Sequence, residues 1–188
     1  MANHVDGYLS IQANEEGMKA FQAIIEQLES KREEGTWGEV HLGELFFDDM
    51  DHPEFTRQWM CDNIGAKWAY ARDWDDDSIS MYSAWSACGG FAEWVVCEVC
   101  KVDPDATGRL EYQDEMPNFI GVATYNKHGM EDDVTLEWDD IQELCMQDNP
   151  ELQELWDEEN MEWKDEDAAY DILWEIKWDV ASDWCSRQ

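Results

Sequence analysis

The sequence is poor in positive charge. Its 188 residues include 12 lysines and arginines against 46 aspartates and glutamates, so the formal net charge is −34. No stretch can form a basic patch that would neutralise phosphates, and charge repulsion opposes the approach of a nucleic acid. The composition therefore argues against direct nucleic-acid binding as the function.

The sequence also lacks long apolar runs. No stretch approaches the roughly 18 apolar residues that a membrane-spanning helix requires, and the first residues lack the basic and apolar regions of a secretory signal. Twelve tryptophans argue against a disordered chain, and six cysteines show no framework spacing. We expect a folded protein of the cytoplasm, or of the host cytoplasm if phage-encoded, with reduced thiols and no membrane partner.

Motifs for catalysis or metal binding are missing as well. The chain has no phosphate-binding glycine loop, nucleophile elbow or HExxH motif. Asp73–Asp77 superficially offers calcium ligands, but Ser78 and Ala84 stand where an EF-hand needs Gly and Glu. Cys97 and Cys100 form a CxxC pair without a second pair, which leaves zinc as a weaker alternative. We expect no enzyme, no cofactor and no metal site.

The centre of the chain predicts an antiparallel hairpin followed by a helix. Lys67–Trp74 and Ser78–Ser86 alternate with period two, with Trp85 expected on the same face as Ile79. The polar run between them is typical of a turn. Residues 91–99 repeat apolar side chains at helical spacing.

The same periodic patterns predict the elements in the rest of the chain. Strands are expected over 5–13, 109–114, 118–125 and 134–138, and helices over 15–32, 53–64 and from 139 onward. The segment 39–47 reads as a short strand or an irregular segment. This order predicts an α+β fold with helices on one face of a mainly antiparallel sheet, whose other face carries aromatic or charged residues. We place the domain at residues 1–147 and an acidic helical extension, packed on the same core, at 148–188.

Several segments resemble the YubB family of phage and plasmid proteins. The GAKWAY run at 65–70 and the SAWS run at 83–86 are similar to its Gly-Thr-Lys-Trp and Ala-Trp-Ser segments, although Ala66 replaces the threonine. The opening residues 2–4 and the run 112–121 are similar too, so the likeness covers most of residues 1–140. It implies a ferredoxin-like domain and a mobile-element origin, and it implies no activity.

Acidic residues concentrate toward the C-terminus. Residues 131–188 contain 21 acidic and 3 basic residues, net −18, which is over half of the total. A final helix is expected from Asp165 or Asp167 to about Trp184. Four of its acids recur every fourth residue, about 6 Å apart along the axis. The predicted partner-binding residues are Asp157, Glu158, Glu159, Glu162, Asp165, Glu166, Asp167, Asp171, Glu175, Asp179 and Asp183.

Carboxylates at this spacing approach the repeat of phosphates along one DNA strand, about 6–7 Å. We therefore hypothesise a DNA mimic that occupies the basic groove of a host DNA-binding protein, such as a restriction, CRISPR or recombination nuclease or a nucleoid protein. A homodimer would double the length of the mimic. The alternative is an adaptor for a basic host protein unrelated to DNA, with Trp156, Trp163 and Trp178 as anchors. For each acid taken alone, a solvated helix face is the more usual reading.

Overall fold

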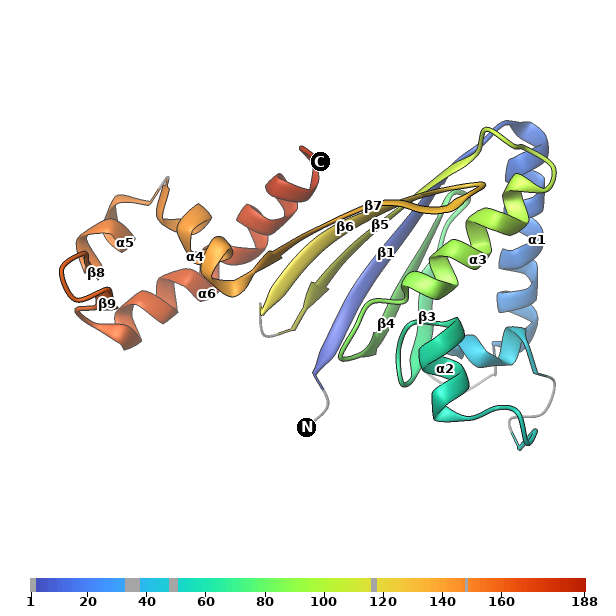
Figure 1. Ribbon diagram of the computed structural model, residues 1–188, viewed down its shortest axis with the longest axis horizontal. Helices are drawn as coiled ribbons and strands as arrows, with labels where there is room; N and C mark the ends of the chain where they lie inside the picture. Colours follow the sequence, from blue (N-terminus) through green and yellow to red (C-terminus); the bar gives the residue numbers. More distant parts are fainter. Residues whose placement is uncertain (1–2, 33–37, 48–50, 116–117, 148) are drawn as a thin grey trace. The chain divides into compact units, whose positions relative to one another are not determined.

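The chain divides into two compact units. The computed structural model describes residues 3–32, 38–47, 51–115, 118–147 and 149–188, without the side chains of residues 178, 181 and 182. The first unit comprises Met1–Met116 and Gly121–Val134, and the second comprises Pro117–Ile120 and Thr135–Gln188. Figure 1 shows the elements in sequence colours.

A seven-stranded antiparallel sheet confirms the predicted α+β class. Neighbouring strands follow the order β2-β3-β4-β1-β5-β6-β7, so the first long strand of the chain lies at the centre. The strands are β1 (His4–Gln12), β2 (Val40–His41), β3 (Ala69–Trp74), β4 (Ser78–Ala84), β5 (Thr107–Asp114), β6 (Phe119–Asn126) and β7 (Gly129–Glu137).

Two helices, α1 (Glu15–Lys31) and α3 (Gly89–Cys100), pack against each other and against strands β1 and β5 (Figure 1). The Asn14 side chain caps α1 by accepting hydrogen bonds from the backbone N–H groups of Glu16 and Gly17. Phe21 and Leu28 of α1 and Phe91 of α3 are fully buried. The apolar faces of these helices therefore supply the largest side chains of the core.

Alternation along the strands separates the core face of the sheet from the opposite face. Val5 and Leu9 of β1 and Ala69 and Ala71 of β3 are buried. Side chains at the intervening positions point the other way because successive residues of a strand face opposite sides. The small alanines on β3 leave room for the bulky helical residues on the core side.

An aromatic cluster occupies the opposite face, as the alternation predicts. The Tyr70 and Tyr82 rings stack with centroids 5.3 Å apart. The Trp68 ring packs edge-on against Tyr82, with centroids 5.8 Å apart. The Arg72 guanidinium lies 4.5 Å from the Tyr82 centroid, and the Tyr82 hydroxyl donates to Glu39 at 2.5 Å. Aromatic cross-strand pairs of this kind stabilise a sheet and fix its register.

The start of helix α2 differs from the sequence-based expectation, whereas the segment before it agrees. Helix α2 spans Arg57–Asn63 and does not begin at Pro53, because the Thr56 hydroxyl caps it by accepting from the Trp59 N–H. The segment 39–47 contains strand β2 and the 3-10 helix η1 (Leu42–Leu45). Both expected alternatives therefore occur in this segment, the short strand as β2 and the irregular part as η1.

Trp85 is a further correction. It was expected to continue the face of Ile79, but β4 ends at Ala84 and Trp85 adopts a positive φ of 71°. The left-handed conformation breaks the alternation and turns the indole outward, where Lys67 Nζ lies 4.9 Å from its centroid.

Besides the ends of β6 and β7, the described residues of the second unit form three helices and a small hairpin. They are α4 (Trp138–Gln147), α5 (Pro150–Leu155), β8 (Trp156–Asp157), β9 (Glu162–Trp163) and α6 (Glu166–Cys185). Helix α4 packs on α5 and α6 through Ile141 and Cys145, both buried. Clustering of contacts therefore groups α4 with the C-terminal helices, together with Pro117–Ile120. The domain division after residue 147 stays a prediction.

None of the described helices is long and apolar enough to cross a membrane.

A glycine contact between β5 and α3 provides a test of the packing. A Cβ added at Gly108 would overlap Cγ2 of Val96, a buried β-branched residue of α3. We expect Gly108→Ala to destabilise the protein by about 1–3 kcal/mol in chemical denaturation, because neither element can move freely. Gly7→Ala on β1 is the matched control, since its nearest neighbour would be Leu110 Cδ1 at 3.5 Å. Equal denaturation midpoints for the Gly108→Ala and Gly7→Ala proteins would contradict this packing.

Candidate partner-binding surface

Helix α6 carries the candidate surface, and its start is set by acidic residues. The Asp165 carboxylate accepts a hydrogen bond from the Ala168 N–H at 3.1 Å, which makes Asp165 the N-cap. Glu166 and Asp167 occupy the first turn, where negative charge interacts favourably with the helix dipole. Ala169 and Leu173 are buried, so the opposite side of the helix faces solvent.

The exposed side of α6 presents one continuous row of carboxylates. Asp167, Asp171, Glu175, Asp179 and Asp183 recur at every fourth position, and all five are exposed. Each step advances about 6 Å along the axis. The row follows the i, i+4 direction, which is inclined by about 26° to the helix axis. Five of the predicted acids therefore lie in one row, and the row begins one step earlier than the four-residue repeat named from the sequence, at Asp167.

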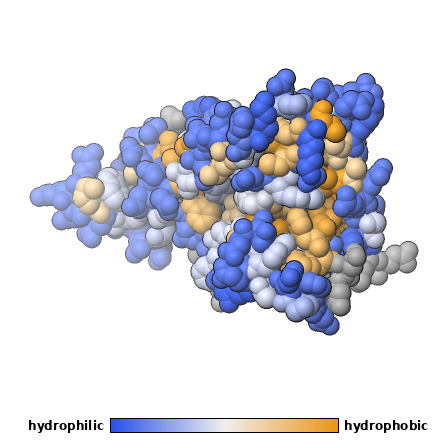
Figure 2. Space-filling model, turned by 45° about the vertical axis from the view of Figure 1, so that its right-hand side comes forward, coloured by the Kyte–Doolittle hydropathy of each residue, from blue (hydrophilic) through white to orange (hydrophobic). Residues whose placement is uncertain are grey.

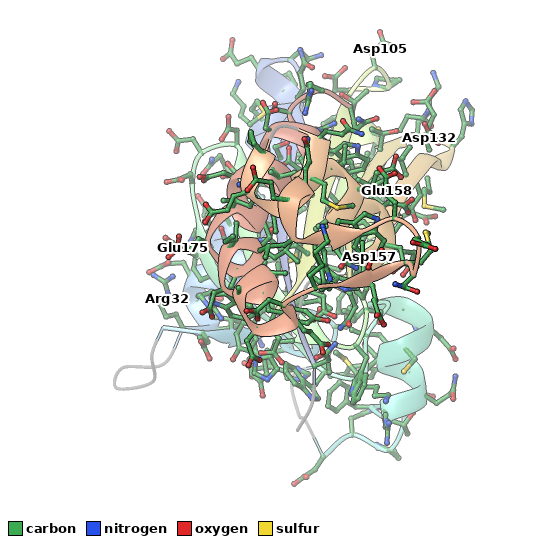
Figure 3. All side chains as sticks on the ribbon, turned by 90° about the vertical axis from the view of Figure 1, so that its left-hand side faces the viewer. Arg32, Asp105, Asp132, Asp157, Glu158 and Glu175 are labelled. Carbon is green, nitrogen blue, oxygen red and sulfur yellow. The ribbon has the colours of Figure 1, made fainter. Side chains whose placement is uncertain are left out.

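Members of the row differ in their partners. Arg187 pairs with Asp183 at 2.7 Å and also donates to its backbone carbonyl, so the C-terminal end of the row is partly neutralised. Among the described side chains, no cation lies within ion-pair distance of Asp171, Glu175 or Asp179. Figure 3 labels Glu175 on this helix. These three residues form the uncompensated centre of the row.

The β8–β9 hairpin holds another predicted residue in a local role. Asp157 Oδ1 accepts from the N–H groups of Glu159 and Asn160, and Oδ2 accepts from the Asn160 side chain at 3.0 Å. The hydrogen bond from the Asn160 side chain is the main reason that the pKa of Asp157 lies below its usual 3.8. Asp157 therefore shapes the turn that displays Glu158 and Glu159.

The remaining predicted acids are exposed around this turn and at the start of α6. Glu158, Glu159 and Glu162 belong to the hairpin, and Glu166 begins the helix. Trp156 and Trp163 are half-buried against each other, with centroids 4.9 Å apart in a T-shaped pair. This mutual packing leaves them less available as partner anchors than the sequence suggests. The side chain of Trp178 lies outside the described part of the chain.

Two aromatic residues of α6 that the sequence reading did not select are exposed beside the acidic row. Tyr170 is 44% exposed and Trp174 is 54% exposed, one turn apart. The Tyr170 ring is parallel to Trp138 with centroids 6.3 Å apart, and Lys177 Nζ lies 3.0 Å from the Trp174 centroid. Their i, i+4 spacing was visible in the sequence, but only packing decides which aromatics of a helix stay outside.

Charge is denser in the second unit than in the first. The second unit has 18 acidic and 3 basic residues, net −15, in 58 residues. The first has 28 acidic and 9 basic residues, net −19, in 130 residues. The second unit therefore has nearly twice the charge per residue. Figure 2 shows one face of the molecule, on which hydrophilic residues surround an area of apolar and intermediate residues.

The described residues do not assemble a metal site. Among them, no group of three or more His, Cys, Asp or Glu side chains is placed to hold an ion. Burial is the main reason that the pKa values of the Cys97 and Cys100 thiols are raised, which disfavours the thiolates that zinc needs. His41 is used structurally, since its Nδ1 accepts from the Gly43 N–H.

Comparisons with models of protein families, with curated protein sequences and with solved structures each found no match.

The cap of α6 is testable by substitution. We expect Asp165→Ala to lower the free energy of unfolding by about 0.5–2 kcal/mol, because the Ala168 N–H loses its partner. Asp165→Asn retains an oxygen acceptor, so its free energy of unfolding should fall much less. Asp171→Ala is the control in the row, and a loss as large as that of Asp165→Ala would contradict the assignment.

The Asp157 turn gives a pH dependence of defined sign. Its folded-state pKa is depressed, so its stabilising contribution is present above the ordinary value of 3.8 and is lost as pH falls through the folded value. The difference in melting temperature between wild type and Asp157→Asn should be constant at neutral pH and shrink below about pH 3.8. A difference that grows in acid would contradict this role.

Proposed function

We propose that this protein is an acidic inhibitor that mimics DNA and occupies the basic groove of a DNA-binding protein. The observation that carries the proposal is the exposed row of carboxylates on α6, from Asp167 to Asp183. Steps of about 6 Å along the axis compare with the 6–7 Å between phosphates of one DNA strand. The Glu158 and Glu159 turn supplies further charge in the same unit.

The energetic cost of the row supports a functional role. Like charges at i, i+4 destabilise a helix by roughly 0.2–0.5 kcal/mol per pair, and the row contains four such pairs. On the order of 1–2 kcal/mol of helix stability is therefore lost to repulsion. Solubility alone is reached with far smaller charges than −34. A basic partner would remove this repulsion on binding.

A phage or plasmid origin, which the resemblance implies, makes host defence nucleases the natural targets. The first unit also supports a ferredoxin-like core. Its strands β3-β4-β1-β5 lie in that order, and α1 and α3 connect them in a βαββαβ sequence once β2, η1 and α2 are set aside as an insertion. In this proposal the core is a scaffold without catalysis, and the protein acts in the host cytoplasm, alone or as a homodimer.

The exposed aromatics favour a second candidate, an adaptor for a basic protein that does not compete with DNA. Tyr170 and Trp174 flank Asp171 and Glu175, and exposed aromatics next to charges resemble a binding hot spot with a polar rim. DNA has no counterpart of an indole pointing outward. The two candidates differ in whether duplex DNA displaces the partner.

A competitive capture experiment separates them. The purified protein is immobilised, bacterial lysate is applied at low salt, and bound proteins are challenged with excess duplex DNA. We expect a DNA-processing protein to bind and to be released by DNA. A partner that stays bound despite the DNA would contradict mimicry and support the adaptor.

Matched variants assign the binding to α6. Asp171→Asn, Glu175→Gln and Asp179→Asn together remove three charges from the row. Asp75→Asn, Asp76→Asn and Asp77→Asn remove the same charge from the exposed β3–β4 turn. The α6 triple variant should lose the partner yet unfold at higher temperature than wild type, because repulsion in the row is relieved. Equal loss in both variants would show that only net charge matters.

A further inference from the structure

Strand β7 is the long edge of the sheet. It stands last in the strand order and spans nine residues, whereas β2 at the opposite edge spans two. Met130 is 56% exposed and Val134 is 36% exposed, and the three acids between them are exposed as well. An edge strand presents backbone N–H and C=O groups to which another strand can pair.

One hydrogen bond shows which backbone groups of β7 point away from β6. The Asp133 N–H donates to the carboxylate of its neighbour Asp132 at 3.0 Å. An N–H engaged in this way is directed away from the β6 ladder. Backbone direction alternates along a strand, so Glu131 shares the outward direction with Asp133. The Asp132 carboxylate therefore occupies the place where an incoming strand would offer a carbonyl.

Charge decides which strand can pair there. Two copies of β7 side by side would bring Glu131, Asp132 and Asp133 of each chain within cross-strand distance, and like charges directly opposite destabilise a sheet. A strand with basic residues at those three positions would instead form opposite-charge pairs on both faces. Met130 and Val134, at the two ends of the acidic run, would meet apolar side chains.

We propose that β7 binds an extended basic segment of a partner protein by adding it to the sheet as an eighth strand. The preferred segment reads apolar, basic, basic, basic, apolar, with the central three residues opposite Asp133, Asp132 and Glu131. Backbone hydrogen bonds hold the added strand against β7, and the acidic side chains make the site specific for basic segments. On binding, the Asp132 carboxylate leaves the Asp133 N–H and pairs with a basic side chain. This site is separate from the α6 row and does not depend on the function proposed for it.

The probe is a synthetic peptide with the core valine, lysine, arginine, lysine, valine, flanked by threonines. Its control has the same side chains and charge but carries N-methyl groups at alternate backbone nitrogens, which prevents strand pairing. We expect the parent peptide to slow amide hydrogen exchange of Glu131 and Asp133 several-fold, measured by NMR, and the N-methylated peptide to leave it unchanged. Equal effects of both peptides, or shifts spread over all acidic regions, would overturn the proposal because they indicate charge attraction alone.

Variants locate the site. Glu131→Pro removes an outward N–H that the β6 ladder does not use, and proline is tolerated on edge strands. We expect Glu131→Pro to raise the dissociation constant of the parent peptide about fivefold or more, because one hydrogen bond and one charge are lost. Glu131→Gln should lose less affinity for the peptide, because it keeps the backbone N–H. The α6 triple variant should bind the peptide as wild type does. A Glu131→Pro protein that folds and binds with wild-type affinity would overturn the assignment.

Discussion

Repulsion among the acidic residues is the constraint on which the rest of this structure depends. A chain with a net charge of −34 must gain enough from its core to remain compact. The core does this with large helical side chains such as Phe21 and Phe91 set against small strand residues such as Ala69 and Ala71. Asp103 and Asp114 are buried in the first unit and are fixed by hydrogen bonds. Asp103 accepts from the Asn14 N–H, and Asp114 accepts from the Asn3 side chain.

The acids fall into two groups with different physical roles. Some act within the chain, as Asp165 does at the start of α6 and Asp157 does in the β8–β9 turn. These have backbone donors within hydrogen-bond distance. Others, with Asp171, Glu175 and Asp179 as the clearest examples, lie on the outside of a helix, and no cation among the described side chains lies within ion-pair distance of them. The second group destabilises the isolated protein, so a partner offers the more direct explanation for it.

We propose two kinds of recognition, one on α6 and one on β7. On α6, side chains form a charged row whose spacing is set by the helix, with Tyr170 and Trp174 beside it. On β7, the backbone groups of an edge strand can pair with an added strand, and the acids there disfavour strands that carry negative charge. Both surfaces favour basic partners. They differ in geometry, because a helix row suits a groove and a sheet edge suits an extended segment.

The sequence by itself determined the elements and their faces where local patterns are strong. Period-two alternation predicted β3 and β4, and helical spacing predicted α1 and the acidic row of α6. The start of α6 was narrowed to Asp165 or Asp167 because capping involves residues within three positions of each other. The α+β class followed from the order of these elements.

Tertiary structure alone decided the rest, because it depends on contacts between residues distant in the sequence. The left-handed backbone at Trp85 ended an alternation that the side-chain pattern would have continued. Packing of α4 with α6 grouped α4 with the C-terminal helices, and α6 leaves Trp174 exposed while Leu173 is buried. Strand β7 became an edge only through the strand order, since local sequence determines which residues form a strand but not which neighbours the strand has.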